Sequence, residues 1–251
     1  MNHSKIGTVE AVMLVLYIII AHTVLSLPKT LLSSTKSATI LNIIYVTIIA
    51  LIFIYIVYRL FKKFPGMDIL DISEVLGGKI LKNIFGAIFV VYFIVTSSIL
   101  LRNFCECLKI VYYPATNIIF VILFFMIAVG ASNHLEFNAT LKANLLIIPV
   151  VLVSIIFLFC ANLKHFTPQR VFPLLGDGFF STFVLGIGNI GAFSGIAFLY
   201  FLPPLLKEPT KFKKVAIFSI VLSAIYLILA VSIILFMFNF FIKIDEICHF
   251  I

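Results

Sequence analysis

The sequence predicts an all-α fold, a polytopic bundle of membrane-spanning helices, and three observations lead to it. Hydrophobic residues make up 63% of the 251 residues and charged residues only 11%, with a mean hydropathy of +1.24. A soluble domain is roughly 45–50% apolar and about 25% charged. Several apolar stretches reach the roughly 20 residues that a helix needs to cross a bilayer. These stretches are too continuous for the alternating pattern of a membrane barrel, and a bilayer does not accommodate open sheets.

Seven apolar stretches are the predicted spans, and short polar segments join them. The spans are residues 9–33, 38–61, 82–103, 113–132, 141–161, 179–203 and 212–241. The largest joint, residues 62–81, has the pattern of an amphipathic helix that lies on the membrane surface through Ile69, Leu70, Ile72, Val75 and Leu76. Because every joint is short, we expect residues 1–251 to form a single membrane domain.

The Lys and Arg residues of the joints predict the orientation of the chain. With the N-terminus in the cytoplasm, eleven of the 18 basic residues face the cytoplasm and seven face outward. The excess lies mainly in the joints after spans two and six, so the positive-inside rule favours a cytoplasmic N-terminus. We therefore attribute the net charge of +8 to interfacial loops and their attraction to membrane lipid, and expect no nucleic-acid binding.

The first span contains a helix-breaking segment at residues 21–28, AHTVLSLP. Ser26 is a candidate N-cap, and Pro28 stands in the first turn of a new half-helix. Such a half-helix points free N–H groups toward the middle of the membrane, which suits a carboxylate. The alternative is a proline kink whose freed carbonyls bond neighbouring hydroxyls. His22, ionisable and deep in the span, either contacts a ligand or a coupling proton, or donates as a neutral imidazole to a freed carbonyl.

The sixth span contains a second and stronger break. Four glycines fall within ten residues there, at Gly186, Gly188, Gly191 and Gly195. Each glycine costs a helix about 1 kcal/mol relative to alanine. Tight packing through the Gly-x-x-x-Gly pair at Gly191 and Gly195 explains two of them and leaves the other two unexplained. We therefore interpret this segment as part of a binding site, where Asn189, Ser194 and freed carbonyls meet an ammonium or hydroxyl group.

A pair of interrupted spans in a membrane bundle is typical of a transporter binding site. Tyr92 on the third span is a candidate wall of the cavity. The candidate ligand-binding residues are Ala21, His22, Thr23, Val24, Leu25, Ser26, Tyr92, Gly186, Gly188, Asn189, Gly191 and Ser194. The sequence has no catalytic triad, carboxylate pair or phosphate loop, so it predicts neither an enzyme nor a cofactor. The Cys105-Glu106-Cys107 pair lacks a second pair at zinc-site spacing, so we expect no metal site.

Five motifs spread along the chain carry a resemblance to a known family. They are residues 24–28 (VLSLP), Phe64-Pro65-Gly66 with Gly77, Arg102 and Glu106 with Pro114, residues 172–178 (FPLLGDG), and Phe201-Leu202-Pro203 before Lys207-Glu208-Pro209. In combination they resemble the spore germination permease family, the B subunits of endospore germinant receptors, in the amino acid–polyamine–organocation superfamily. Arg102 and Glu106 also stand at i, i+4, where we expect an interfacial ion pair.

This resemblance implies an inverted-repeat transporter fold of ten helices with substrate between the first and sixth. The sequence then holds seven of the ten expected spans: a first repeat (1–161) and an incomplete second one (179–251), as in a C-terminally truncated member. The family usually has glycines where this chain has Ala21 and Thr23, which implies a narrower cavity. The expected partners are an A-type subunit and a lipoprotein C-type subunit, in the spore inner membrane.

Three functions follow from these expectations. The first is a membrane subunit of a germinant receptor that binds a small nutrient such as an amino acid between broken helices one and six. The second is an amino acid permease coupled to H⁺ or Na⁺. The third is a structural subunit of the receptor that binds no nutrient. A receptor needs a site but not a full transport cycle, so the short second repeat favours the first.

Overall fold

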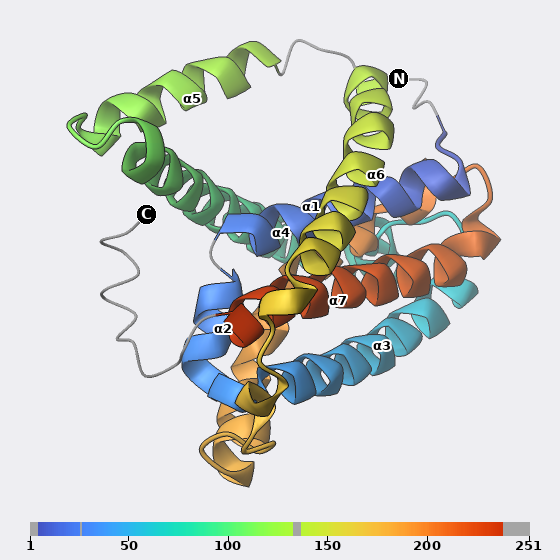
Figure 1. Ribbon diagram of the computed structural model, residues 1–251. Helices are drawn as coiled ribbons and strands as arrows, with labels where there is room; N and C mark the ends of the chain where they lie inside the picture. The colour runs from blue at the N-terminus through green and yellow to red at the C-terminus, as the bar shows by residue number, and fades with distance from the viewer. Residues whose placement is uncertain (1–4, 26, 133–136, 238–251) are drawn as a thin grey trace.

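The structure is a computed structural model that describes residues 5–25, 27–132 and 137–237 (Figure 1). For residues 22–25, 27, 29, 132 and 137–141 it describes the backbone alone. The described chain is helical, and its one β contact is an isolated bridge between Ile6 and Leu206. The predicted all-α fold is therefore confirmed.

Seven α-helices and one irregular helical segment are the main elements of the described chain, and short 3₁₀ turns lie between some of them. They are α1 (Thr8–Leu25), α2 (Leu27–Thr35), α3 (Thr39–Lys63), α4 (Ile69–Tyr112), α5 (Ile118–Ser132), α6 (Phe137–Ala161), the irregular pair η4 (Phe180–Val184) and η5 (Leu185–Phe201), and α7 (Phe212–Met237). Five helical stretches in the described residues are long and apolar enough to cross a membrane, and two apolar helices are shorter. This confirms a membrane helix bundle. The division into seven spans and two repeats stays a prediction.

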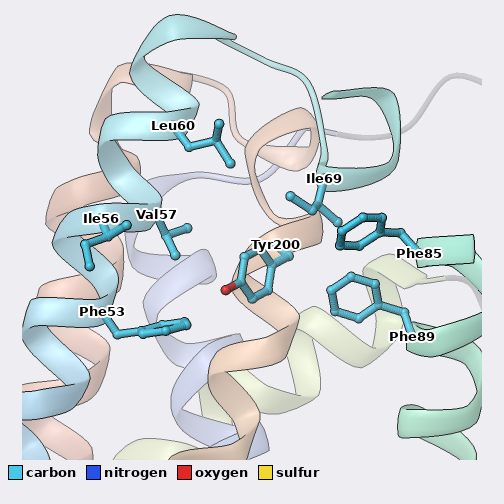
Figure 2. Close-up of a pocket in the computed structure, with 8 residues that line it drawn as sticks. All are labelled: Phe53, Ile56, Val57, Leu60, Ile69, Phe85, Phe89 and Tyr200. Carbon is cyan, nitrogen blue, oxygen red and sulfur yellow. The ribbon is translucent and has the colours of Figure 1, made fainter. Parts of the chain in front are cut away.

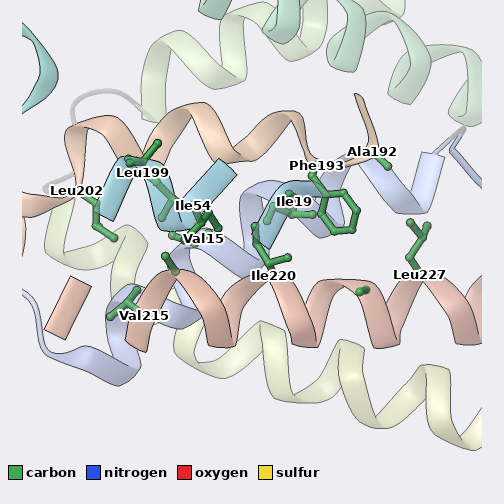
Figure 3. Close-up of a cluster of buried hydrophobic side chains, with 14 of the residues drawn as sticks. Val15, Ile19, Ile54, Ala192, Phe193, Leu199, Leu202, Val215, Ile220 and Leu227 are labelled. Atoms are coloured by element: carbon green, nitrogen blue, oxygen red, sulfur yellow. The ribbon is translucent and has the colours of Figure 1, made fainter. Parts of the chain in front are cut away.

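The hydrophobic core lies where α1, α3, η5 and α7 meet (Figure 3). Val15 and Ile19 of α1 pack with Ile54 of α3, and Phe193 of η5 belongs to the same cluster. The facing side of α7 holds small residues such as Ala216, and small residues let membrane helices approach closely. The hydroxyls of Ser219 and Ser223 bond carbonyls of their own helix, so these two polar groups are paired within the close face.

The predicted joint at residues 62–81 is helical from Ile69 onward, where it forms the start of α4, and it bends at Gly78. Asp68 caps the first turn by accepting from the Asp71 N–H at 2.8 Å. Gly78 has a φ of 70°, which interrupts the helix. Lys82 donates to Glu74 across the bend at 2.6 Å, and this hydrogen bond lowers the pKa of Glu74. The apolar face is divided: Ile72 is buried in the core, whereas Val75 and Leu76 are exposed.

The N-terminal segment pairs with the joint that follows η5. The Ile6 N–H donates to the Leu205 carbonyl at 2.8 Å, and the Lys207 N–H donates to the Ile6 carbonyl at 2.9 Å. These two segments therefore lie at the same end of the bundle. The predicted orientation requires them to share one side of the membrane, and a cytoplasmic N-terminus stays a prediction.

Candidate functional site

The first break separates α1 from α2. Helix α1 ends at Leu25 and α2 begins at Leu27, and α2 runs at a steep angle to α1 (Figure 1). Ser26, the predicted N-cap, lies outside the described residues. The same holds for the side chains of His22, Thr23, Val24 and Leu25, although their backbone is helical. The break is thus at the predicted place, and the roles of these side chains stay predictions.

The second break combines a change in how tightly the backbone is wound with a kink at Phe193. Residues 180–184 form a wide π turn, and residues 185–201 are wound as a 3₁₀-helix that departs from helical angles at Phe193 (φ −100°, ψ 24°). We call η4 and η5 together the helix-six segment. A 3₁₀ stretch of this length is uncommon and marks a hinge or a strained sequence. The predicted second break is therefore a kink at Phe193 within a helical segment of altered pitch, and the role of half-helix ends there stays a prediction.

An asparagine on α3 holds the altered winding in place. Asn42 is fully buried, and its Nδ2 donates to the carbonyls of Thr182 at 2.7 Å and Gly186 at 3.0 Å. Its Oδ1 accepts from Asn189 Nδ2 at 2.7 Å, and Asn189 Nδ2 also reaches Ser34 Oγ of α2 at 3.0 Å. We call these five residues the Asn42 brace. The brace connects α2, α3 and the helix-six segment, so it links the two broken spans.

The four glycines of the second break divide into two pairs. A Cβ at Gly186 would collide with Asn42 Nδ2, and a Cβ at Gly195 would lie 2.8 Å from Ile19 Cγ1 and 3.3 Å from the Ile19 backbone nitrogen. Gly188 and Gly191 have no described atom within 4 Å of an added Cβ. The packing interpretation therefore holds at Gly195, where η5 touches α1, and not at Gly191. Position 186 requires a glycine because the Asn42 side chain of the brace occupies the space that a Cβ would need.

Tyr92 of α4 contacts Ser194 of η5 close to α1. Tyr92 Oη donates to the Ser194 carbonyl at 2.8 Å, which ties α4 to η5. Ser194 Oγ is buried and has no hydrogen-bond partner within the described chain. The adjacent Gly195 packs on Ile18 and Ile19, less than one helical turn before Ala21. We call this place the Ser194 junction. A buried hydroxyl without a partner costs about 1–3 kcal/mol, which a polar ligand group would recover.

Asn189, a predicted ligand-binding residue, forms hydrogen bonds within the protein. We expected its amide to face a ligand, but both of its polar atoms bond within the Asn42 brace, Nδ2 to Asn42 and Ser34, and Oδ1 to Ser34 Oγ at 3.2 Å. Sequence reasoning also missed Asn42 and Asn144. Asn144 on α6 is 3% exposed, and its Nδ2 has no partner in the described chain. The signal was available, because an amide inside an apolar span is rare and has to find a partner.

The family of the chain can now be stated. The family described as spore germination protein matches residues 5–245. The chain belongs to this family. No curated protein and no solved structure matches it significantly. Together with the long apolar helices, membership identifies a germination-related integral membrane protein, from a family of membrane permeases and receptor subunits that is not an enzyme family.

This spore germination protein also has an apolar groove between α3, α4 and the end of η5 (Figure 2). The groove has a volume of about 340 Å³. Its lining is Phe53, Ile56, Val57, Leu60, Ile69, Phe85, Phe89 and Tyr200. None of the predicted site residues lines it, and the Tyr200 hydroxyl is its one polar side-chain group. Such a lining suits a hydrocarbon chain and not a charged amino acid.

Charged side chains of the spore germination protein lie outside both breaks. The predicted ion pair between Arg102 and Glu106 is confirmed, with Nε and Oε1 2.9 Å apart on the exposed surface of α4. Within the described ranges, no group of three or more His, Cys, Asp or Glu side chains is placed to hold a metal ion. The polar groups described at the Asn42 brace and the Ser194 junction are neutral: hydroxyls, amides and backbone carbonyls.

Proposed function

We propose that this spore germination protein is a membrane subunit of a nutrient germinant receptor, and that it binds an amino acid at the Ser194 junction. The observation that carries the proposal is the Ser194 hydroxyl, buried and without a partner in the described chain beside the contact between α1 and η5. A ligand hydroxyl or ammonium pairs with this oxygen. The carboxylate then turns toward the start of α2, where free N–H groups favour a negative charge.

A receptor also has to convert binding into a change of shape. Binding shifts a conformational equilibrium only by the difference in affinity between the two states. In this proposal the ligand favours one pitch of the helix-six segment, and the Asn42 brace conveys that change to α2 because it bonds both elements. Our proposed partners in the spore inner membrane are the A-type and lipoprotein C-type subunits. They respond to the change in the position of α2.

The variant Ser194→Ala tests the site because we expect it to weaken amino acid binding without destabilising the unliganded protein. Removing the hydroxyl takes away one ligand hydrogen bond, so the amino acid concentration for half-maximal germination rises about tenfold. The unliganded protein is equally or more stable, since the variant removes a buried polar group that had no partner. Each standard amino acid is tested in turn, by spore germination and by thermal stabilisation of the purified protein.

Ser154→Ala is the matched control, because Ser154 is exposed and its hydroxyl bonds the Val151 carbonyl of its own helix. It leaves the dose–response unchanged. The proposal is wrong if Ser194→Ala responds to every amino acid as the native protein does, a result that favours a structural subunit. Saturable uptake of labelled amino acid into proteoliposomes would favour a permease instead.

A further inference from the structure

Two cations share one aromatic ring where the end of α3 meets the start of α7. Arg59 Cζ lies 5.3 Å from the centre of the Tyr55 ring, and Lys213 Nζ lies 5.8 Å from the same centre. Lys213 Nζ is also 5.4 Å from the centre of the Tyr58 ring. Three of these side chains belong to the last three turns of α3, and Lys213 belongs to the first turn of α7.

These cations have no carboxylate partner in the described chain. None of its ion pairs includes Arg59 or Lys213, and the nearby Glu208 is paired with Lys211 at 2.7 Å. A cation–π contact at an exposed site gives only about 0.5–1 kcal/mol. The ring contacts therefore do not replace a counter-ion, and the two like charges repel each other.

The first turn of α7 makes the local charge more unfavourable. The N-terminus of a helix carries a partial positive charge and favours acidic side chains. The first turn of α7 has no acidic residue and carries Lys213 and Lys214 instead. Repelling side chains and the helix dipole thus place positive potential at one spot. An anion bound there would reduce both the repulsion between the basic side chains and their unfavourable interaction with the helix dipole.

Apolar side chains continue this surface toward the predicted membrane. Ile52 and Ile56 are 58% and 60% exposed, and with Arg59 they stand at i, i+4 and i+7, on one face of α3. Ile56 also lines the apolar groove of Figure 2, so the two apolar surfaces are continuous. The cations lie at the ends of predicted spans two and seven. The pattern is therefore a cationic patch at the interface with an apolar track behind it.

We propose that Tyr55, Tyr58, Arg59 and Lys213 form a site for an anionic phospholipid, which we call the Tyr55 lipid site. Its headgroup phosphate lies between the guanidinium of Arg59 and the ammonium of Lys213, and an acyl chain follows Ile52 and Ile56. Basic pockets between membrane helices recognise anionic headgroups in this way. Charge complementarity favours an anionic lipid over a zwitterionic one, and the apolar track favours a lipid over a soluble phosphate.

Native mass spectrometry of the purified protein tests the site with two lipids of equal chain length, phosphatidylglycerol and phosphatidylcholine. The native protein retains phosphatidylglycerol preferentially. The variants Arg59→Gln and Lys213→Gln each lower its apparent affinity about fivefold, and the double variant about 25-fold, because one basic side chain contributes about that factor near a membrane surface. Arg59→Lys keeps the charge and most of the affinity.

The matched control is the double variant Lys109→Gln and Lys164→Gln, which removes the same charge at the other predicted side of the membrane. It changes the affinity less than about twofold, since its charges lie more than a screening length away. Equal losses in both double variants would overturn the site, as would equal retention of the two lipids. Displacement of phosphatidylglycerol by an equimolar amount of soluble glycerophosphate would also overturn it, since the apolar track would then contribute nothing. If the double variant does not fold, the two single variants decide.

Discussion

Replacing Asn42 by alanine will destabilise the bundle by about 2–4 kcal/mol. Interhelical hydrogen bonds in membranes contribute about 0.6 kcal/mol on average and up to about 1.7 kcal/mol each. Asn42 makes three, to the carbonyls of Thr182 and Gly186 and from the amide of Asn189, and it is fully buried. The alanine variant leaves these groups unpaired and adds the cost of their desolvation. Unfolding of the purified protein in mixed micelles measures the loss.

The matched control is Asn162→Ala. Asn162 donates to the Leu158 carbonyl, four residues earlier in the chain, from the exposed end of α6. Water can replace that bond, so this variant changes the free energy of unfolding by less than about 0.5 kcal/mol. If the two variants are destabilised equally, the brace does not hold the helix-six segment as we describe. In spores, the weakened brace should also reduce the response to nutrient without changing the ligand contacts at Ser194.

Replacing Gly195 by alanine will push α1 away from η5 and destabilise the protein by about 1–3 kcal/mol. The added methyl group would meet Ile19 Cγ1 at 2.8 Å and Ile18 Cγ2 at 3.0 Å, closer than ordinary van der Waals contact. The Ile19 backbone nitrogen, 3.3 Å away, limits how far the neighbours can move. Because this contact borders the Ser194 junction, we expect the nutrient response to be lost as well.

Gly191→Ala is the control for this second prediction, because no described atom lies within 4 Å of a Cβ at Gly191. Alanine is a better helix former than glycine by about 1 kcal/mol, so this variant is neutral or stabilising. The two variants make the same chemical change in the same helix and are expected to differ in sign. Equal destabilisation by both would mean that the winding of η5, and not its contact with α1, requires glycine.

The fold class and the places of the two breaks could be predicted from the sequence. The apolar fraction and the run lengths require helices in a membrane, and Ser26 and Pro28 mark the end of α1 within a residue. The amphipathic joint and the Arg102–Glu106 pair are also local, since they depend on residues one or two turns apart. In each case, the interaction that matters lies within one helix.

The roles of single site residues could not be predicted in this way. The glycines of one motif serve two purposes: Gly186 makes room for Asn42, and Gly195 makes room for α1. At Gly188 and Gly191 an added Cβ would meet no described atom within 4 Å. In the sequence Asn189 has the features of a ligand-binding amide. In the structure its amide bonds Asn42 and Ser34, which are 147 and 155 residues away in the chain. What a glycine or an amide does depends on the atom that faces it from another helix.

The sequence by itself determined that this protein is a membrane helix bundle with helix-breaking segments at residues 21–28 and 186–195, because hydrophobicity, run length and helix-breaking residues act along the chain. Only the tertiary structure decided that the second break is a helical segment of altered pitch with a kink at Phe193, held by Asn42. The tertiary structure also left the Ser194 hydroxyl buried beside α1 without a partner among the described residues. The physical reason is that freed carbonyls and hydroxyls have to be satisfied. Which group satisfies them is set by the packing of helices that are distant in the sequence.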